Sequence, residues 1–362
     1  MEKRKFVKLR DITPGMLLGE TVVDGQGRSM IEKGEVLDDF QIRYLRTSRV
    51  PGIFVYQEIS EQDIPIPEGT KMVVRRERRP DRKLVQYSED IKSLIRSGVE
   101  EMFDNPSTDM MSGIAVGLAK DMVENVVSSH AAALDISQVK ISDEYNLKHS
   151  ADVATIALSI GRSLGLRSTE LEELCIAGLL HDIGKSHIPQ NLLNKPSKLT
   201  KEEFSVIKSH SLYGYLILKS KNCFSKRILE AVIQHHERIN GSGYPRGLRG
   251  NEINLFARII AVADIFDALV SKRPYKDPYT VHEAIEMMLG MYEDLDLDIL
   301  KAFLNTIVLY PVDTIVKLSN GKYAKVVENY PLYPLRPKVV RVDNGQVLDL
   351  SNDTRATNIV IW

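Results

Sequence analysis

The chain has 362 residues, of which 43% are hydrophobic and 27% are charged. This length predicts two or three folding units, and the composition excludes a disordered, collagen-like or rod-shaped coiled-coil chain. Its 48 basic residues balance 49 acidic ones for a net charge of −1, so the chain lacks the basic excess that broad nucleic-acid binding requires, and we expect no DNA or RNA partner.

The cysteines and the hydrophobic segments indicate a cytoplasmic protein. Cys175 and Cys223 are too few for a disulfide framework, which fits a reducing compartment. No segment reaches the roughly 18 consecutive apolar residues that a membrane helix needs. The first ten residues are basic, but no apolar signal core follows them, so we expect neither export nor a membrane segment.

Residues 1–66 predict a small β-rich module of the α+β class. Glycine and proline turn signals separate short apolar runs, with one short helix expected at 38–45 and a strand at 53–56. The segment IPIPEG at 64–69 interrupts regular structure and is typical of a linker. We interpret this module as regulatory and as a site for signalling partners.

Residues 67–139 predict a linker and a helical connector. The pattern is helical from residue 84 to 134, with an interruption near Asn105 and Pro106. Apolar residues then recur every three or four positions and form a stripe, which either packs on the next domain or forms a homodimer surface. The stripe consists of Met111, Ile114, Leu118, Met122 and Val126. We favour packing on the next domain.

Residues 140–308 predict an all-α domain. Val153, Ile156, Ile160 and Leu164 would form one apolar stripe, and residues 257–269 are apolar nearly all round, as in a core helix. Thr200 and Thr280, each followed three positions later by glutamate, are typical of capping boxes at helix starts.

After residue 310 the apolar period changes to two. Asn320-Gly321 and Asn344-Gly345 predict hairpin turns, because asparagine and glycine tolerate the positive φ of type I′ turns. Residues 309–362 therefore predict a small antiparallel β appendage.

Histidines cluster in the helical region. Six of the eight fall between residues 149 and 236, all but His187 being candidate ligands, and Asp264 lies within the apolar run at 257–269. A carboxylate in a core helix is costly unless it is paired or bound to a metal. Imidazole and carboxylate ligands favour a first-row transition metal such as iron or manganese, and the absence of a cysteine ligand argues against a structural zinc site. Together these residues predict a two-metal cage.

Two motifs carry a family resemblance. HDIGK at 181–185 and HHERINGSGYP at 235–245 resemble the HD-GYP domain of the HD phosphohydrolase superfamily, and the similarity covers about residues 140–308. It includes the segments around His149, His210 and Asp264. The resemblance implies an all-α helical bundle that hydrolyses cyclic di-GMP to linear pGpG and, in some members, on to GMP.

The resemblance also implies the metal ligands. One ion would be held by His149, His181, Asp182 and Asp264, and a second by His210, His235 and His236, with Asp182 bridging the two. Some members bind a third ion through a glutamate four residues before the first histidine. Tyr145 occupies that position here and Glu144 is one step out of phase, so we expect two divalent ions, with iron favoured over manganese.

The expected chemistry is phosphodiester hydrolysis. Two metal ions about 3.5–4 Å apart can share a hydroxide that attacks the phosphorus near neutral pH. Asp182 and Lys185 are the predicted catalytic residues, the lysine stabilising the charge on the departing oxygen. The predicted substrate contacts are Lys185, Gly243, Tyr244, Pro245, Arg273 and Lys276, of which Tyr244 would stack on a guanine and the last two would face the other phosphate.

Three other functions stay open. The chain could act on another cyclic dinucleotide such as cyclic GMP-AMP, or on nucleotides as the broader HD class does. It could also be a non-catalytic scaffold that binds a cyclic dinucleotide, although a pure binding module has no need for a full set of metal ligands. Asp152, one helical turn after His149, is a candidate to orient that histidine.

Overall fold

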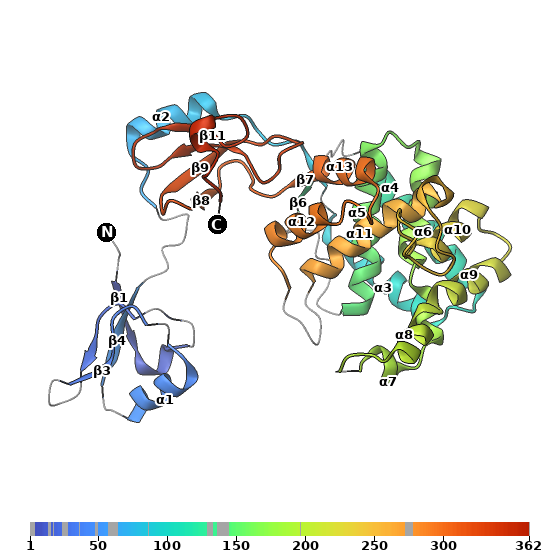
Figure 1. Ribbon diagram of the computed structural model, residues 1–362, viewed down its shortest axis with the longest axis horizontal. Helices are drawn as coiled ribbons and strands as arrows, with labels where there is room; N and C mark the ends of the chain where they lie inside the picture. Colours follow the sequence, from blue (N-terminus) through green and yellow to red (C-terminus); the bar gives the residue numbers. More distant parts are fainter. Residues whose placement is uncertain are drawn as a thin grey trace. The chain divides into compact units, whose positions relative to one another are not determined.

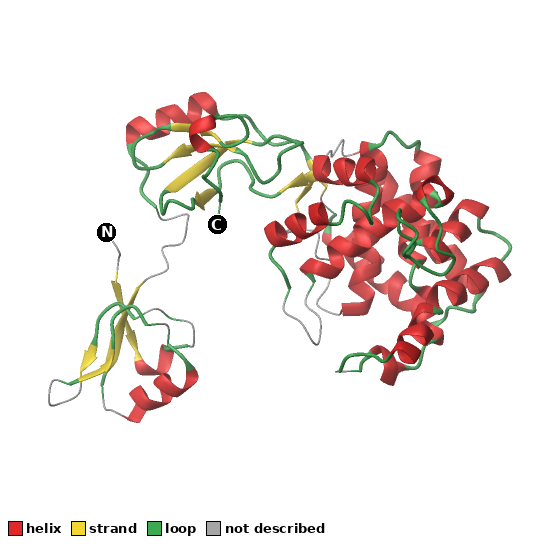
Figure 2. Ribbon diagram, viewed as in Figure 1, coloured by secondary structure: helices red, strands yellow, loops and turns green. Residues whose placement is uncertain are grey.

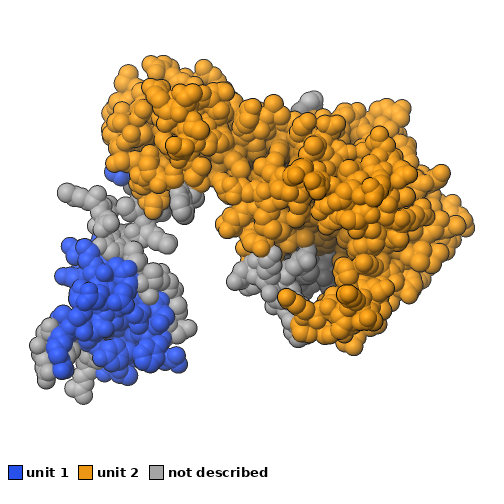
Figure 3. All heavy atoms as spheres, viewed as in Figure 1, with its two compact units in different colours: residues 1–66 blue, residues 67–362 orange. Residues whose placement is uncertain are grey.

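The computed structural model describes residues 4–13, 16, 18–23, 28–35, 37–47, 50–56, 64–85, 87–128, 133–135, 145–195, 197–271 and 278–361. The chain divides into two compact units, residues 1–66 and 67–362, which Figure 3 colours separately. Within the ranges given above, no helix has both the length and the apolar character needed to cross a membrane.

The first unit is a small α+β fold. Strand β1 (Arg4–Lys8) pairs antiparallel with β4 (Gly52–Tyr56), and β2 (Val22–Val23) pairs antiparallel with β3 (Ser29–Ile31). Helix α1 (Asp39–Thr47) contributes Leu45 to a core that also contains Leu18 and Leu37. The short helix and the strand predicted here from the sequence are confirmed.

Helices dominate the second unit, as the red ribbons of Figure 2 show. The bundle consists of α3 (Glu89–Asp104), α4 (Asp109–Ser128), α5 (Tyr145–Ser163), α6 (Ser168–Leu180), α7 (Gln190–Leu193), α8 (Lys201–Lys208), α9 (His210–Ser220), α10 (Lys226–Gln234), α11 (Leu255–Val270), α12 (Val281–Gly290) and α13 (Leu297–Thr306). Thr200 and Thr280 each accept a hydrogen bond from the glutamate N–H three residues later, so both predicted capping boxes are confirmed.

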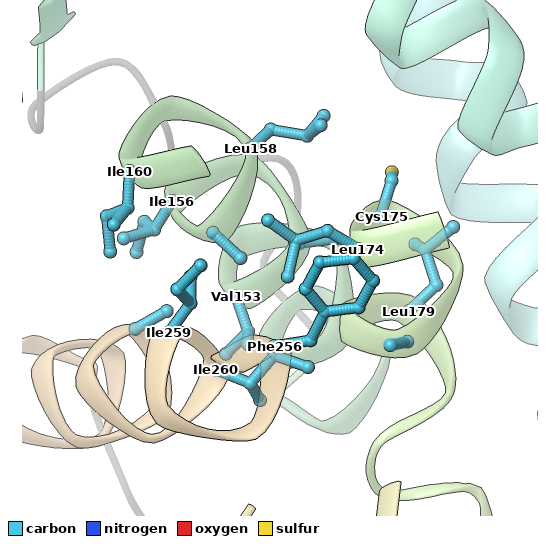
Figure 4. Close-up of a cluster of buried hydrophobic side chains, with 14 of the residues drawn as sticks. Val153, Ile156, Leu158, Ile160, Leu174, Cys175, Leu179, Phe256, Ile259 and Ile260 are labelled. Carbon is cyan, nitrogen blue, oxygen red and sulfur yellow. The ribbon is translucent and has the colours of Figure 1, made fainter. Parts of the chain in front are cut away.

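Helices α5, α6 and α11 form the centre of the core. Figure 4 shows apolar side chains of all three helices gathered together, among them Val153 and Ile156, Leu174 and Leu179, and Phe256 and Ile260. The apolar run at 257–269 is indeed a core helix, α11. Leu164 departs from the predicted stripe and is 37% exposed, because α5 ends one residue before it.

The stripe on α4 packs inside the bundle. Met111, Leu118, Met122 and Val126 are all buried in the same core as α5 and α6. The Sγ atom of Cys175 lies 3.7 Å from the Sδ atom of Met122. The interpretation that we favoured is therefore confirmed, and these four residues are not available as a dimer surface.

The connector is not helical throughout. Residues 84–85 and 133–135 form strands β5 (Leu84–Val85) and β6 (Ala133–Asp135), which pair in parallel with each other and with β7 (Ile307–Val308). The prediction of helix up to residue 134 is wrong at both ends, because strands of two or three residues are too short to show an alternating pattern. The predicted break falls between α3 and α4.

Residues 315–349 contain a four-stranded antiparallel sheet. Its order is β11 (Val347–Asp349), β10 (Lys338–Arg341), β9 (Tyr323–Glu328) and β8 (Ile315–Lys317), and both predicted turns adopt positive φ at glycine, 76° at Gly321 and 71° at Gly345. Helix α2 (Glu68–Glu77) packs on this sheet through Val74, which meets residues of β9 and β10. Residues 68–77, assigned from the sequence to the connector, thus contact the C-terminal sheet.

Candidate metal centre

The histidines and aspartates singled out in the sequence converge at one place in the bundle. Most lie where a helix begins or ends, and the helices that carry or precede them, α5, α6, α9, α10 and α11, lie together in the bundle (Figure 1). His149 lies in the second turn of α5, His181 and Asp182 follow α6, His210 begins α9, His235 and His236 follow α10, and Asp264 lies on α11.

The carboxylate of Asp182 lies between two groups of imidazoles. Its Oδ2 atom is 3.3 Å from Nε2 of His181 and 3.6 Å from Nε2 of His149. Its Oδ1 atom is 3.3 Å from Nε2 of His210 and 3.9 Å from Nε2 of His235. The donor atoms of each group, the second including His236, lie within 4.8 Å of one another. One carboxylate therefore faces two sets of donors with its two oxygens.

Backbone hydrogen bonds orient three of the rings. The Nδ1 atom of His181 lies 2.8 Å from the Gly178 carbonyl oxygen. Nδ1 of His210 and of His235 likewise lie 2.7 Å and 2.6 Å from the carbonyl oxygens three residues before them. A carbonyl only accepts, so Nδ1 must carry the proton, and the Nε2 lone pair is left facing the cluster.

His149 is oriented by a carboxylate instead. Its Nδ1 atom lies 2.7 Å from Oδ2 of Asp267, and its Nε2 atom lies 3.2 Å from Oδ1 of Asp264. Oδ1 of Asp267 accepts a hydrogen bond from the Ser271 hydroxyl at 3.0 Å. Asp267 is therefore the partner at Nδ1, the role for which the sequence suggested Asp152. Asp267 is buried on α11, three residues after Asp264.

Two buried atoms of the cluster test whether a cation fits. Among the described residues, Nε2 of His181 and Oδ1 of Asp182 are buried without a hydrogen-bond partner. An unsatisfied buried lone pair costs about 1–3 kcal/mol or more, and a cation relieves that cost. The donor set of imidazoles and carboxylates suits a divalent metal. The residues present thus fit a metal ion.

Burial and neighbouring charges set the protonation of the cluster. Burial would raise the pKa of Asp182, but the charge of Lys185 and the adjacent imidazoles outweigh it and hold this pKa well below its usual range. Burial lowers the pKa of His235 far below its usual value and that of His236 to about 3. Neutral imidazoles beside an ionised carboxylate are the protonation states that metal binding requires.

His149 has the opposite shift. Burial alone would lower its pKa, but hydrogen bonds to Asp264 and Asp267 outweigh burial and raise it to about 10. In the absence of a metal ion, the positive charge that the two carboxylates attract is thus supplied by a proton on this imidazole.

Gly184 permits the close packing that brings two ligand segments together. A Cβ atom there would clash with the carbonyl oxygen of His210 and the amide nitrogen of Gly214 on α9. Gly184 lies inside the 3₁₀ helix η3 (Ile183–His187), which follows the end of α6 at Leu180. A glycine is needed here for contact rather than for helix termination.

Only some of the predicted substrate-binding residues lie beside the cluster. The Lys185 ammonium pairs with Oδ2 of Asp182. Gly243 and Tyr244 line a cavity of about 230 Å³ beside His235, His236 and Asp264, whereas Pro245 is exposed and not among the lining residues. Gly243 also packs on the backbone of residues 236–238, where a Cβ atom would clash.

Some predictions fall outside the residues that the structure describes. Arg273 and Lys276 belong to the segment 272–277, and Glu144 to the segment 136–144. The side chain of Tyr145, the residue that would replace a third-metal glutamate, is likewise outside the described part. These four positions stay predictions.

One functional residue was missed from the sequence. Glu237 is buried, and its Oε1 and Oε2 atoms accept the N–H groups of Arg246 and Leu248 at 2.7 Å and 3.0 Å. It thereby fixes the loop that carries Tyr244 beside the histidines. Its place directly after His235 and His236 was the available signal.

Comparison with known proteins relates this chain to HD-domain proteins. Residues 122–299 match a family model described as HD domain. The cyclic di-GMP phosphodiesterase PA4108 of Pseudomonas aeruginosa is 35% identical over 259 residues, which cover 70% of this chain and 62% of that protein.

Two further relatives are named for different substrates. The cyclic di-GMP phosphodiesterase response regulator RpfG of Xanthomonas campestris is 47% identical over 131 residues, 36% of this chain and 35% of that protein. The 3'3'-cGAMP-specific phosphodiesterase 3 of Vibrio cholerae is 32% identical over 278 residues, 73% of this chain and 56% of that protein. The chain spans less than two-thirds of the length of each of these three relatives.

Proposed function

Because residues 122–299 belong to the HD-domain family, and their motifs and relatives identify its HD-GYP group, we propose that this chain is a phosphodiesterase that hydrolyses cyclic di-GMP. The product is linear pGpG, with GMP as the product of a second cleavage. The observation that carries the proposal is the carboxylate of Asp182 between two groups of imidazoles. Cyclic di-GMP carries two anionic phosphodiesters, and a group of side chains that bind metal cations suits hydrolysis of such a substrate.

The proposed cofactors are two divalent transition-metal ions, with iron preferred and manganese as the alternative. His149, His181, Asp182 and Asp264 would hold one ion, and His210, His235 and His236 would hold the other together with Asp182. When bound, such ions activate water and offset negative charge on phosphate oxygens. Asp264 is outside both of the compact donor groups, but its Oδ1 atom lies 3.2 Å from Nε2 of His149.

Residues of the chain would position the diester and support its cleavage. Asp182 is held ionised by Lys185, so it can serve both donor groups at neutral pH. The Lys185 ammonium can stabilise the charge on the departing 3′ oxygen. Tyr244, whose ring centroid is 4.7 Å from that of His236, can stack on a guanine beside the cleaved phosphate.

A second substrate has specific support. The Vibrio cholerae relative that covers 73% of this chain carries a name specifying 3'3'-cGAMP. Cyclic GMP-AMP retains one guanine and both phosphates, so a site with one guanine-selective contact could accept it. Competition between cyclic di-GMP and cyclic GMP-AMP, measured as relative kcat/KM, separates the two substrates.

We also propose that residues 1–66 form a regulatory module, joined by the connector 67–139 to a catalytic domain at 140–308 and an appendage at 309–362. The separate hydrophobic core of the first unit supports the boundary near residue 66. A cytoplasmic location belongs to the same proposal, as does a homodimer formed through a surface other than the buried stripe of α4. Sedimentation of the purified chain tests the oligomeric state.

The first test is anaerobic purification followed by metal analysis and a product time course with cyclic di-GMP. His181→Ala and Asp182→Ala should each lower bound metal and reduce kcat by at least about a thousandfold, because each removes a central donor. Anaerobic handling keeps ferrous ions from oxidising.

His187→Ala is the matched control. His187 lies six residues after His181, is exposed, and contacts Ser186 and Tyr213 rather than the cluster. This variant should keep full metal and activity. Full metal and activity in the Asp182→Ala variant would overturn the assignment, and tight binding of cyclic di-GMP without hydrolysis by the metal-loaded wild type would favour a scaffold.

A further inference from the structure

The cavity beside the candidate metal centre has a wall that includes residues of α8. His235, His236 and Asp264 line this cavity of about 230 Å³. Phe204 and Lys208 of α8 line it too, and together with Tyr244 they form this wall. A substrate phosphate at the histidines would therefore have its neighbouring base next to these three side chains.

Lys208 has an unusual environment in this wall. Its ammonium lies 4.7 Å from the ring centroid of Phe204 and 5.2 Å from that of Tyr244. Across the described part of the chain, no carboxylate forms an ion pair with it. Aromatic faces attract the ammonium but do not use its N–H donors. The charge is thus held at the cavity with its hydrogen-bonding capacity free for a ligand.

Phe204 and Tyr244 form an aromatic corner. Their ring centroids are 6.4 Å apart, with an angle of 80° between the ring planes, and the Phe204 side chain is 44% exposed. Tyr244 in turn lies over His236 with an angle of 30° between the rings. Flat aromatic surfaces at a right angle present one face and one edge to a planar ligand, which suits a purine.

Helix α8 is anchored so that this wall is preformed. Glu203 completes the capping box with Thr200, and its two carboxylate oxygens also accept from the Lys195 ammonium at 2.7 Å and 2.6 Å. Phe204 and Lys208 are four residues apart and therefore share one face of this helix. Binding of a base would require little reorganisation here, which favours affinity.

We propose that Phe204 and Lys208 complete a guanine-selective subsite for the base beside the cleaved phosphate, an inference that rests on the proposed hydrolysis of cyclic di-GMP. The ammonium of Lys208 donates to O6 and N7 of guanine, both of which are acceptors. Adenine presents an N6 amino donor in place of O6, so the same ammonium disfavours it. Phe204 packs against the purine ring.

The test is Lys208→Met, which keeps the aliphatic stem and removes the charge. The KM for cyclic di-GMP should rise about tenfold or more, with a smaller change in kcat, because a charge-assisted contact to the base is lost. GMP should inhibit the wild type competitively at lower concentration than AMP does, and the variant should lose this preference. Lys208→Arg, which also donates to O6 and N7, should largely restore it.

Lys201→Met is the control on the same helix, since Lys201 is exposed and does not line this cavity. It should behave as the wild type. Phe204→Ala should raise KM about tenfold through lost stacking, with bound metal unchanged.

The outcomes separate the inference from the function on which it rests. An unchanged KM, or a wild-type preference for GMP over AMP, in Lys208→Met would overturn the subsite while leaving the hydrolysis intact. A raised KM with the GMP preference retained would mean that Lys208 only supports Tyr244, and would also overturn it. A fully metal-loaded wild type that does not hydrolyse cyclic di-GMP would instead refute the proposed function.

Discussion

The orientation of the imidazoles depends on single hydrogen bonds at Nδ1. His181, His210 and His235 each donate to a carbonyl oxygen three residues earlier, a partner that the helix backbone supplies without any particular side chain. His149 lies near the start of α5 and relies on the carboxylate of Asp267. A carboxylate partner makes an imidazole a stronger donor to a metal. Asp267 is therefore the residue outside the ligand set whose substitution should matter most.

Asp267→Asn should lower metal affinity about 10–100-fold, because the amide lacks the charge that holds the Nδ1–H tautomer of His149. Titration with metal, read as ions bound per chain, measures the effect, and circular dichroism verifies the fold. Ser271→Ala removes only the hydroxyl that donates to Oδ1 of Asp267 and should have a smaller effect. Equal metal affinity in Asp267→Asn and wild type would contradict the positioning role.

At the scale of elements, a loop and the end of a helix act as one structure. The loop at residues 238–249 returns to the end of α10, where the Tyr244 N–H donates to the His236 carbonyl at 3.1 Å. Glu237 accepts two further N–H groups from the same loop. Three hydrogen bonds within residues 236–248 therefore connect the histidines to the loop that lines the cavity.

Glu237→Ala should release this loop. Two partly buried N–H groups would lose their acceptor, at about 0.5–1.5 kcal/mol each, and the KM for cyclic di-GMP should rise several-fold as Tyr244 moves. Bound metal should change little, since Glu237 is outside both donor groups. Steady-state kinetics with metal analysis measures both quantities.

Glu252→Ala is the matched control. Glu252 is exposed and accepts the N–H of Arg249 near the end of the same loop. Its loss should leave KM unchanged. A Glu237→Ala variant that loses metal in proportion to activity would show that the residue supports the histidines rather than the loop.

At the scale of the whole molecule, the hydrophobic cores determine which parts of the chain unfold as one cooperative unit. The first unit has its own core, which includes Leu18 and Leu45. The core of the bundle, which includes Phe266 and Phe303, surrounds the candidate metal centre and belongs to the second unit. A ligand that binds only the native state of one unit stabilises that unit.

Removing metal with a chelator should therefore lower the thermal transition of the second unit and leave that of the first unit in place. At a free metal concentration of 100 times Kd, the stabilisation is about 2.7 kcal/mol, which corresponds to a shift of several degrees for a unit of this size. Differential scanning calorimetry with and without chelator measures it. Equal shifts of both transitions would contradict the separation of the cores.

Much of the fold was predictable from local pattern. Capping residues, apolar periodicity and Asn-Gly turns depend on contacts within a few residues, so Thr200, Thr280, Gly321 and Gly345 marked their elements correctly. Strands β5 and β6 were missed because they are short and depend on partners far along the chain. The same reason hid the packing of α2 on the C-terminal sheet.

The sequence by itself determined the family, the chemical type of the site and the residues to examine, because a metal centre needs particular donor atoms and the motifs carry them. Only the tertiary structure decided how those donors meet: that Asp182 presents one oxygen to each histidine group, that Asp267 rather than Asp152 bonds to His149, and that α8 supplies Phe204 and Lys208 to the cavity. These relations join distant segments, and side-chain direction at a helix end is set by packing that no local pattern encodes.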